Sequence, residues 1–356
     1  MKAFLSLLLL LIVASVVQGR QEKNKGTKFY SASDPRIQYT GRIDFTNPAL
    51  PRFWAPGVYV QTGFTGTECE ILMNDESYGN SHNYISVVVD AGPAQRIKLT
   101  DRKNILKVAG NLRDQKHTLL ICKTTESNIG YLEFVGIRCA GLFKVPKPDR
   151  KIEFIGNSIT CGTGSDTSTV RCGQGAWHDQ HNAYMSYGPL TARTFNAQWH
   201  LTAYSGIGLI HSCCDLKYVM PQIFDKVNMR DDTITWNFKK YQPDVVTVCL
   251  GQNDGIQDST AFCTSYLNFL GKLRSCYPKA TLICLTSPMA EERLLQVQKS
   301  YIESITEAAH AHGDRKIYRY FFSKRYFHGC DSHPDLSEHQ QIAAELSSFI
   351  RQIESW

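Results

Sequence analysis

The sequence lacks several features that define whole classes of protein. Its 39 lysines and arginines and 33 aspartates and glutamates are scattered along the chain, with a net charge of only +6. No basic cluster therefore indicates a nucleic acid or a membrane surface as a partner. No cysteines or histidines have the Cys-x-x-Cys or His-x-x-x-His spacing that is typical of zinc sites. We therefore expect no metal ion and no other cofactor.

Long hydrophobic runs are also missing. The apolar stretch at residues 4–17 is shorter than the roughly 20 residues that a membrane-spanning helix needs. It follows Lys2 and is followed by Gln18-Gly19-Arg20, and this order of a basic start, a short apolar core and small residues is typical of a secretory signal peptide. The sequence predicts a cleaved signal peptide at residues 1–19, a secreted or periplasmic protein, and a polar tether at residues 20–38.

Cysteines, by contrast, are numerous. Twelve cysteines in an exported chain suggest disulfide bonds. However, Cys122, Cys249 and Cys284 lie in apolar, strand-like runs, where a free thiol packs as a small hydrophobic group. Cys213 and Cys214 are adjacent, so a bridge between them would be strained. We expect one or two bridges, and the sequence leaves their pairing open.

The hydrophobic pattern changes near residue 150. Between residues 39 and 143, short alternating runs are separated by Gly, Asn, Asp and Pro, and no long helical pattern intervenes. The predicted strands are 58–61, 69–72, 84–89, 96–99, 105–108, 118–123 and 132–137. Many short strands at this spacing favour an antiparallel, jelly-roll-like β-sandwich. Residues 144–150 contain two prolines, which favour extended backbone, and form the predicted linker.

From residue 151 to 356, compact apolar runs alternate with helical patterns. The predicted strands are 152–155, 199–204, 245–250, 281–285 and 317–322, and the predicted helices are 183–195, 260–276, 290–312 and 337–353. This alternation predicts an α/β fold class, with a parallel sheet covered by helices on both faces. Asp335 and Glu338 form a capping-box pattern that marks the start of the last helix.

Residues that can carry chemistry follow three of these strands and precede the last helix. In open α/β sheets, ligands bind beyond the carboxyl ends of the strands. The four motifs are Gly156-Asn157-Ser158, Ser205-Gly206-Ile207-Gly208, Gly251-Gln252-Asn253-Asp254 and Asp331-Ser332-His333-Pro334. Each alone is common, because such residues usually cap helices or form turns. Together they supply a nucleophile, oxyanion donors and a base, which is the set that an acyl-transfer enzyme requires.

The four motifs, in this order, resemble those of the SGNH (GDSL-type) hydrolases, whose catalytic part is a three-layer α/β/α domain. The β-rich half narrows the resemblance to carbohydrate esterase family 2. The segments that carry this are Thr40-Gly41-Arg42, Phe64-Thr65-Gly66-Thr67, Gly92, His117 to Glu126 and Gly130-Tyr131-Leu132-Glu133-Phe134. The resemblance covers nearly all of the mature chain. It implies an esterase that removes O-acetyl groups from plant cell-wall polysaccharides such as xylan or mannan.

Carried over onto this sequence, the resemblance implies a role for each motif. Ser158 attacks the ester carbonyl, and His333 takes its proton and returns it to the leaving sugar hydroxyl. The backbone N–H groups of Ser158 and Gly206 and the side-chain amide of Asn253 hold the oxyanion. Gly208 is the alternative to Gly206.

The sequence also departs from the family pattern. The acid of SGNH enzymes lies three residues before the histidine, and here that position is Cys330. Asp331 is the candidate substitute, because residues i and i+2 of an extended segment point the same way and Pro334 favours extended backbone at His333. The alternative is a Ser–His dyad in which a backbone carbonyl replaces the acid. Asn157 stands where many members have Asp, which keeps hydrogen bonding but removes a charge.

Trp177 lies in the insert at residues 161–182, close behind the nucleophile. Its aromatic face would suit a sugar ring, so we expect it to line the substrate site; ordinary packing in a surface loop is the alternative. The expected partner is an acetylated polysaccharide or oligosaccharide, and we expect the enzyme to be a monomer.

Two other functions are possible on the same fold. A non-catalytic carbohydrate-binding protein is favoured only by Asn157 and Cys330, and the intact Ser158, Asn253 and His333 argue against it. A lipase or thioesterase would need an apolar acyl channel, which the polar insert does not suggest.

Overall fold

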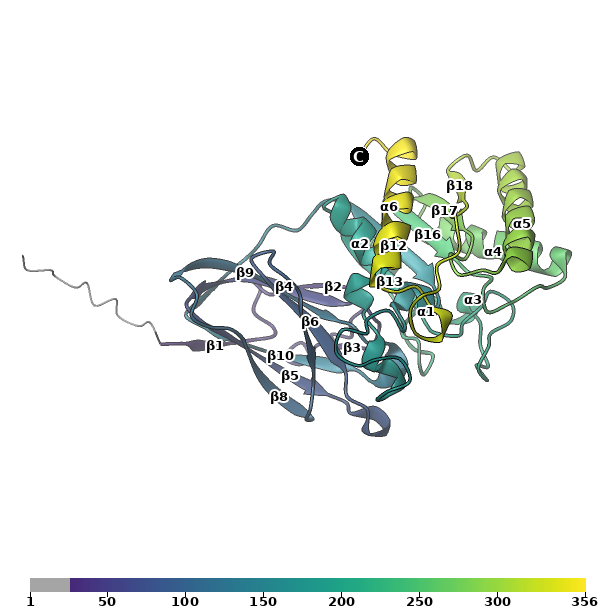
Figure 1. Ribbon diagram of the computed structural model, residues 1–356. Helices are drawn as coiled ribbons and strands as arrows, with labels where there is room; N and C mark the ends of the chain where they lie inside the picture. The colour runs from purple at the N-terminus through teal and green to yellow at the C-terminus, as the bar shows by residue number, and fades with distance from the viewer. Residues whose placement is uncertain (1–25) are drawn as a thin grey trace, which may run out of the picture.

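The computed structural model describes residues 26–356 (Figure 1). The predicted signal peptide, at residues 1–19, lies outside this range. The chain forms an N-terminal region of antiparallel sheets, residues 28–143, and a C-terminal region, residues 151–356, built on a parallel sheet. The predicted fold class is confirmed. Within residues 26–356, none of the helices combines the length and the apolar character needed to cross a membrane.

The N-terminal region consists of two packed sheets. The first contains β1 (Lys28–Ser31), β3 (Arg52–Phe53), β5 (Cys69–Asp75), β8 (Lys103–Ala109) and β10 (Leu132–Cys139). The second contains β2 (Gln38–Thr40), β4 (Tyr59–Gly66), β6 (Tyr84–Val89), β7 (Gln95–Lys98), β9 (Gln115–Lys123) and β11 (Gly141–Phe143). Strand β5 alternates strictly between buried and half-buried residues. Its buried Ile71 and Met73 belong to the same apolar core as Ile121 of β9, because each sheet turns one face inward.

The prediction of a polar tether at residues 20–38 is wrong for residues 28–31. These residues form β1, which pairs with β10 in an antiparallel register that places Tyr30 opposite Ile137. The hydroxyl of Tyr30 also donates a hydrogen bond to the carbonyl of Ala140. A strand at the edge of a sheet is held by main-chain hydrogen bonds, and these cannot be predicted from its side-chain composition.

The C-terminal region has three layers. Its parallel strands are β12 (Lys151–Gly156), β13 (Gln198–Ala203), β16 (Val245–Cys249), β17 (Thr281–Leu285) and β18 (Ile317–Tyr320). Its α-helices are α1 (Ser158–Cys161), α2 (Tyr187–Thr194), α3 (Met220–Ile223), α4 (Ser259–Cys276), α5 (Glu292–Ala311) and α6 (Leu336–Ile353). Strands β14 (Lys226–Asn228) and β15 (Thr233–Thr235) form a small hairpin. The 3₁₀-helices within residues 26–356 are η1 (Tyr78–Asn80), η2 (Ser127–Ile129), η3 (Trp177–Gln180), η4 (Ala183–Met185), η5 (Phe238–Lys240) and η6 (Cys330–Ser332).

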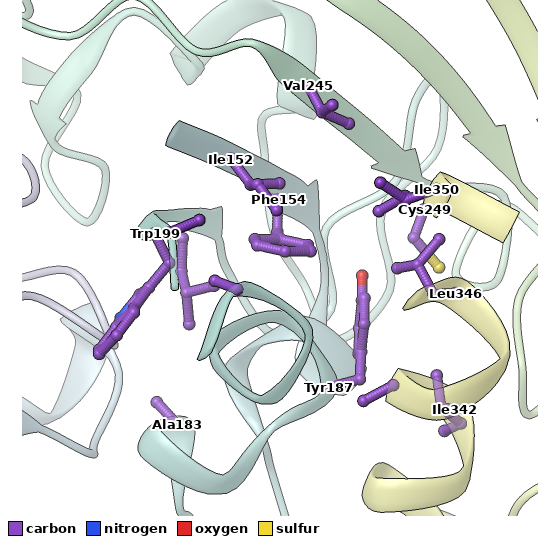
Figure 2. Close-up of a cluster of buried hydrophobic side chains, with 14 of the residues drawn as sticks. Ile152, Phe154, Ala183, Tyr187, Trp199, Val245, Cys249, Ile342, Leu346 and Ile350 are labelled. Carbon is purple, nitrogen blue, oxygen red and sulfur yellow. The ribbon is translucent and has the colours of Figure 1, made fainter. Parts of the chain in front are cut away.

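Helices cover both faces of the parallel sheet. On one face, Tyr187 of α2 and Leu346 of α6 pack with Phe154 of β12 in one apolar cluster (Figure 2). On the other face, Phe269 of α4 and Ile305 of α5 belong to a second cluster. Because helices cover both faces, β16 and β17 are buried at every residue and are mostly apolar, which is the pattern that the sequence shows.

One predicted helix is divided in the structure. Residues 183–195 form η4 and then α2, with extended backbone at Ser186 between them. Pro189 lies in the first turn of α2 and has no N–H, and its ring would clash with the carbonyl four residues earlier in a continuous helix. The capping box at the start of α6 is confirmed, since Asp335 accepts from the N–H of Glu338.

The strand order of the parallel sheet determines where a ligand can bind. The order is β13-β12-β16-β17-β18, so the chain moves outward in opposite directions from the gap between β12 and β16. Ligands in open α/β sheets bind beyond the carboxyl ends of the strands at such a switch point. The motifs of Ser158 and Asn253 follow β12 and β16, and the Gly206 motif follows β13.

The two regions share a buried interface. The ring of Tyr59 lies 4.1 Å from that of Trp199, measured between centroids, and the indole N–H of Trp199 donates to the carbonyl of Gly57 at 2.9 Å. Arg42 and Glu153 form an ion pair across the interface at 3.0 Å, with side chains 1% and 0% exposed. The N-terminal region therefore packs directly against β12 and the edge strand β13 of the parallel sheet.

Two disulfides are present among the described residues, Cys172–Cys330 and Cys213–Cys214. Cys122, Cys249 and Cys284 are buried free thiols, as predicted. The adjacency of Cys213 and Cys214 predicts a strained bridge, yet the structure joins these two cysteines. Cys214 and Asp215 both adopt left-handed backbone, with φ of 60° and 61°, and this turn brings the neighbouring side chains together.

Candidate active site

Ser158 lies just beyond the end of β12, the second strand of the parallel sheet. Strand β12 ends at Gly156, where a side chain would collide with the hydroxyl of Thr160, so only glycine permits this sharp exit. The side chain of Asn157 accepts a hydrogen bond from the N–H of Ile159 at 3.2 Å. Ser158 is then the first residue of α1 and is only 7% exposed. The local sequence thus directs its hydroxyl to the sheet edge.

His333 contacts Ser158 directly. The Ser158 hydroxyl lies 2.8 Å from Nε2 of His333, and Nδ1 of His333 lies 3.2 Å from the carbonyl oxygen of Cys330. A carbonyl can only accept, so Nδ1 carries the proton and Nε2 is free to accept from the serine. His333 has extended backbone, as Pro334 predicts. This geometry is the one that a serine nucleophile and its base require.

The Cys330 carbonyl is held from several sides. Its residue is bonded to Cys172, with a Cα–Cα distance of 5.2 Å, and its N–H donates to the carbonyl of Gly164 at 2.8 Å. Gly164 in turn is so close to Cys330 that a side chain there would clash. The acceptor that orients His333 is therefore attached to the insert at residues 161–182.

Asp331 was predicted to orient His333, but in the structure the carbonyl of Cys330 lies next to Nδ1 of His333 instead. Asp331 adopts left-handed backbone, with φ of 52°, and its exposed side chain makes no hydrogen bond to His333 within the described residues. Residues 330–332 form η6 and are not extended, so the side chains of residues 331 and 333 do not point the same way. The Cys330 carbonyl takes the position instead.

The electrostatics of His333 are set mainly by its burial. Removal from water lowers the pKa of His333 below its ordinary value of 6.5, and this effect outweighs the hydrogen bond to Cys330 and the nearby carboxylates of Glu126 and Asp331, which raise the pKa. The imidazole is therefore neutral at neutral pH. A neutral imidazole can accept the proton of Ser158.

Gly206 offers a free backbone donor. Its φ of 81° lies in the left-handed region, which favours glycine, and within residues 26–356 its N–H donates to no backbone acceptor. Gly208, the alternative, is already engaged, because its N–H donates to the hydroxyl of Ser212 at 3.0 Å. Of the two glycines, Gly206 is the one that can serve an oxyanion.

Asn253 and Asp254 organise the opposite side of the same loop. One N–H of the Asn253 amide donates to the carbonyl of Ile207 at 2.8 Å, which orients the amide and leaves its second N–H available. The buried carboxylate of Asp254 accepts from three consecutive backbone N–H groups at residues 209–211, at 2.7 to 3.0 Å. The Gly-Gln-Asn-Asp motif therefore also holds the loop of Gly206.

Ser158, His333, Gly206 and Asn253 line one cavity of about 340 Å³. This volume is within the usual range of small-ligand sites. Trp177 is 44% exposed at its rim. The lining residues are Asn128, Ser158, Trp177, Tyr204, Ser205, Gly206, Cys213, Cys214, Leu216, Gln252, Asn253, Met289, Asp331 and His333. All the residues predicted for the site are thus brought together. No group of three His, Cys, Asp or Glu side chains in residues 26–356 is arranged to hold a metal ion.

Sequence reasoning missed the buried polar residues behind the cavity. Glu126, Thr163 and His181 are fully or almost fully buried, and Glu126 accepts from Thr163 at 2.6 Å. Glu126 belongs to the N-terminal region, whereas the other two belong to the C-terminal region. Glu126 ends the segment His117 to Glu126 that carries the family resemblance, but a charged residue shortly after a strand is ordinary and indicates no role at the active site.

A serine–histidine pair at the switch point of a five-stranded parallel sheet, beside free backbone N–H groups, defines the class of serine hydrolases. Family models identify both parts of the chain: "Carbohydrate esterase 2 N-terminal" matches residues 39–148, and "GDSL-like Lipase/Acylhydrolase family" matches residues 154–352. The chain belongs to carbohydrate esterase family 2 and is a carboxylic ester hydrolase.

Curated relatives agree with this assignment. The Cellulase/esterase CelE of Acetivibrio thermocellus is 32% identical over 91% of this chain, but the match spans only 40% of that protein. An acetylxylan esterase / glucomannan deacetylase of Cellvibrio japonicus is 28% identical, and the match covers 96% of each chain.

Solved structures show the same fold. A family two carbohydrate esterase from Clostridium thermocellum, in complex with cellohexaose, has a TM-score of 0.82 and 31% identity, covering 89% of this chain and 98% of that one. A family two esterase from Cellvibrio japonicus has a TM-score of 0.83 and 28% identity, covering 92% and 98%.

Proposed function

We propose that this protein is a secreted esterase that removes O-acetyl groups from plant cell-wall polysaccharides, such as xylan, mannan or related glycans. The observation that carries the proposal is the 2.8 Å contact between the Ser158 hydroxyl and Nε2 of His333, in a cavity that also contains Gly206 and Asn253. The relatives named as acetylxylan esterase and glucomannan deacetylase support the choice of acyl group and glycan.

The proposed reaction proceeds through an acyl-enzyme. Ser158 Oγ attacks the acetyl carbonyl carbon while Nε2 of His333 takes its proton, and the backbone N–H groups of Ser158 and Gly206 and the amide of Asn253 hold the oxyanion. The tetrahedral intermediate collapses, the C–O bond to the sugar breaks, and His333 returns the proton to the sugar oxygen. Water, deprotonated by His333, then attacks the acetyl-serine; the bond to Ser158 Oγ breaks, His333 returns the proton to Oγ, and acetate is released.

The proposed dyad replaces the usual acid with a main-chain group. The Cys330 carbonyl keeps Nδ1 of His333 protonated and its ring in the orientation that reaches Ser158. A carbonyl has a dipole but no net charge, so it orients the imidazolium more than it stabilises it.

We infer that the glycan lies across the cavity against Trp177. An exposed indole beside a nucleophile offers an apolar face for a sugar ring, while the side chains of Asn128 and Gln252 offer hydrogen bonds to its hydroxyls. The related structure that holds cellohexaose supports a chain-like ligand. We further propose a monomer, exported by a signal peptide at residues 1–19, with a sandwich domain and a catalytic domain joined at residues 144–150.

The proposal is tested by measuring acetate release. The purified protein is incubated with acetylated xylan, acetylated glucomannan and p-nitrophenyl acetate, and acetate is measured enzymatically. We expect turnover of at least one glycan. Hydrolysis of p-nitrophenyl acetate without acetate release from any acetylated glycan would refute the substrate class while leaving the esterase chemistry intact.

Asp331→Ala should reduce kcat/KM by less than about threefold, because its side chain does not contact His333. An acid of a Ser-His-Asp triad typically contributes on the order of 10⁴ in kcat. The measurement is steady-state hydrolysis of p-nitrophenyl acetate by both proteins. A loss of 10³ or more would assign Asp331 the role that we give to the Cys330 carbonyl.

The pH profile should reflect the burial of His333. Because only the neutral imidazole accepts the serine proton, kcat/KM rises with pH through the pKa of His333, which burial lowers below 6.5. We expect the acid limb of kcat/KM to have its midpoint below pH 6.5, measured in buffers of constant ionic strength. A midpoint above pH 7 would contradict the buried, neutral imidazole.

A further inference from the structure

Glu126 is a buried carboxylate of the N-terminal region whose side-chain hydrogen bonds all go to the C-terminal region. It follows β9 and is 0% exposed. Its Oε2 accepts from the backbone N–H of Ser205 at 2.9 Å, and its Oε1 accepts from the hydroxyls of Ser205 and Thr163, both at 2.6 Å. A fully buried charge is costly unless it is well paired, so these three bonds need an explanation beyond packing.

The partners of Glu126 are the two segments that form the active site. Ser205 immediately precedes Gly206, which lines the cavity beside Ser158 and is the proposed oxyanion donor. Thr163 follows α1, and its N–H donates to the carbonyl of Ser158 at 3.0 Å. The hydroxyls of Thr163 and Ser205 also lie 2.9 Å apart. One carboxylate therefore joins the segment that carries the nucleophile to the segment that carries the oxyanion donor.

Glu126 itself is held firmly. The buried ammonium of Lys123 donates to the carbonyl of Glu126 at 2.9 Å and to that of Thr125 at 2.7 Å. Asp254 holds residues 209–211, beyond Gly206, through three backbone N–H groups, so the oxyanion loop is fastened at both ends. At the end next to Gly206, the backbone N–H of Ser205 donates to Glu126, and no other side chain within residues 26–356 accepts from it.

We propose that Glu126 is a positioning residue for esterase catalysis, through which the N-terminal region holds the Ser205–Gly206 turn in register with Ser158. This inference rests on the proposed function, because it assigns Gly206 to the oxyanion. Its consequence is that the sandwich completes the active site, in addition to any role in holding glycan. Oxyanion donors must be held in place before the charge develops, so a loosened turn reduces the rate of the chemical step.

The test compares Glu126→Ala with Glu76→Ala. Glu76 is the matched control, because its carboxylate also crosses the interface, accepting from Arg230 at 2.9 Å, but does not line the cavity. We expect Glu126→Ala to lower kcat for p-nitrophenyl acetate by about tenfold to 100-fold, with KM changed by less than about threefold. Glu76→Ala should stay within about twofold of wild type. A Glu126→Ala enzyme that keeps the wild-type kcat would overturn the proposal.

Glu126→Gln separates positioning from charge. Gln keeps the shape, and its amide oxygen can still accept from Ser205 N–H, so we expect it to recover most of the kcat that Ala loses. The groups that face His333 are Glu126, Asp331, His181 and His339. Since the carboxylate of Glu126 raises the pKa of His333, its removal should move the acid limb of kcat/KM to lower pH. A purely structural residue would not move this limb, and Glu76→Ala should leave it unchanged.

Two further measurements keep the outcomes distinct. If Glu126→Ala does not fold, as judged by circular dichroism, Ser205→Ala removes one of the three bonds, and an unchanged kcat in that variant overturns the proposal. If the wild type is no more active than Ser158→Ala, the proposed function itself fails. If wild type is active and both Glu126→Ala and Ser205→Ala match it, only the positioning role fails.

Discussion

Ser158→Ala should lower kcat for acetate release by about 10⁴-fold or more, because it removes the proposed nucleophile of the acyl-enzyme. The substitution removes one hydroxyl from a residue that is 7% exposed. That hydroxyl donates to Nε2 of His333 and forms no other hydrogen bond within residues 26–356. Folding and glycan binding should therefore persist. The measurement is acetate release from an acetylated glycan, with thermal unfolding as a check on the fold.

The matched control is Ser304→Ala, a serine on the exposed side of α5 whose hydroxyl bonds only to its own helix. Its activity should equal that of wild type. If Ser158→Ala and wild type release acetate at the same rate, the nucleophile has been assigned wrongly. A small residual rate is compatible with the assignment, since the oxyanion donors and substrate binding alone retain part of the acceleration over water.

Arg42→Met should lower the free energy of unfolding by about 3 to 5 kcal/mol, since it leaves the carboxylate of Glu153 buried without its partner. Arg42 is 1% exposed and bonds across the interface to Glu153 and to the carbonyls of Phe224 and Lys226. Within residues 26–356, the hydrogen-bond partner that Glu153 then keeps is the hydroxyl of Thr202, at 2.6 Å. The measurement is urea-induced unfolding followed by fluorescence and circular dichroism.

Two further variants identify the cause. Arg138→Met breaks an ion pair with Glu70 whose side chains are 41% and 36% exposed, and it should cost less than about 1 kcal/mol. Glu153→Leu added to Arg42→Met removes the uncompensated charge and should recover part of the loss. A cost below 1 kcal/mol for Arg42→Met would mean that water or rearrangement compensates Glu153 at the interface.

Much of the site could be predicted because strand ends are visible in the sequence. Apolar runs bounded by glycine indicate where β12, β13 and β16 end, and parallel strands bring these ends to one sheet edge. Ser158, Gly206 and Asn253 follow those runs directly, so their meeting is a consequence of local pattern and topology. His333 could be added because a capping box fixes the start of α6 a few residues later.

The orienting group of His333 could not be predicted in the same way. A backbone carbonyl has no residue-type signature, and the i, i+2 rule that favoured Asp331 holds only in extended chain. The turn at η6 begins at Cys330, which is bonded to Cys172, 158 residues away in the sequence. Cysteine positions alone do not specify which cysteines pair. Neither the turn nor the carbonyl that accepts from His333 could therefore be predicted from the sequence.

The amino-acid sequence by itself determined the fold class, the strand ends and the motif residues Ser158, Gly206, Asn253 and His333, because hydrophobic periodicity and turn chemistry are local. Only the tertiary structure decided that the Cys330 carbonyl, and not Asp331, accepts from His333. It also brought Glu126 from another region to the loop that contains Ser205 and Gly206. Contacts between distant segments depend on how the two regions pack, and no local pattern encodes that packing.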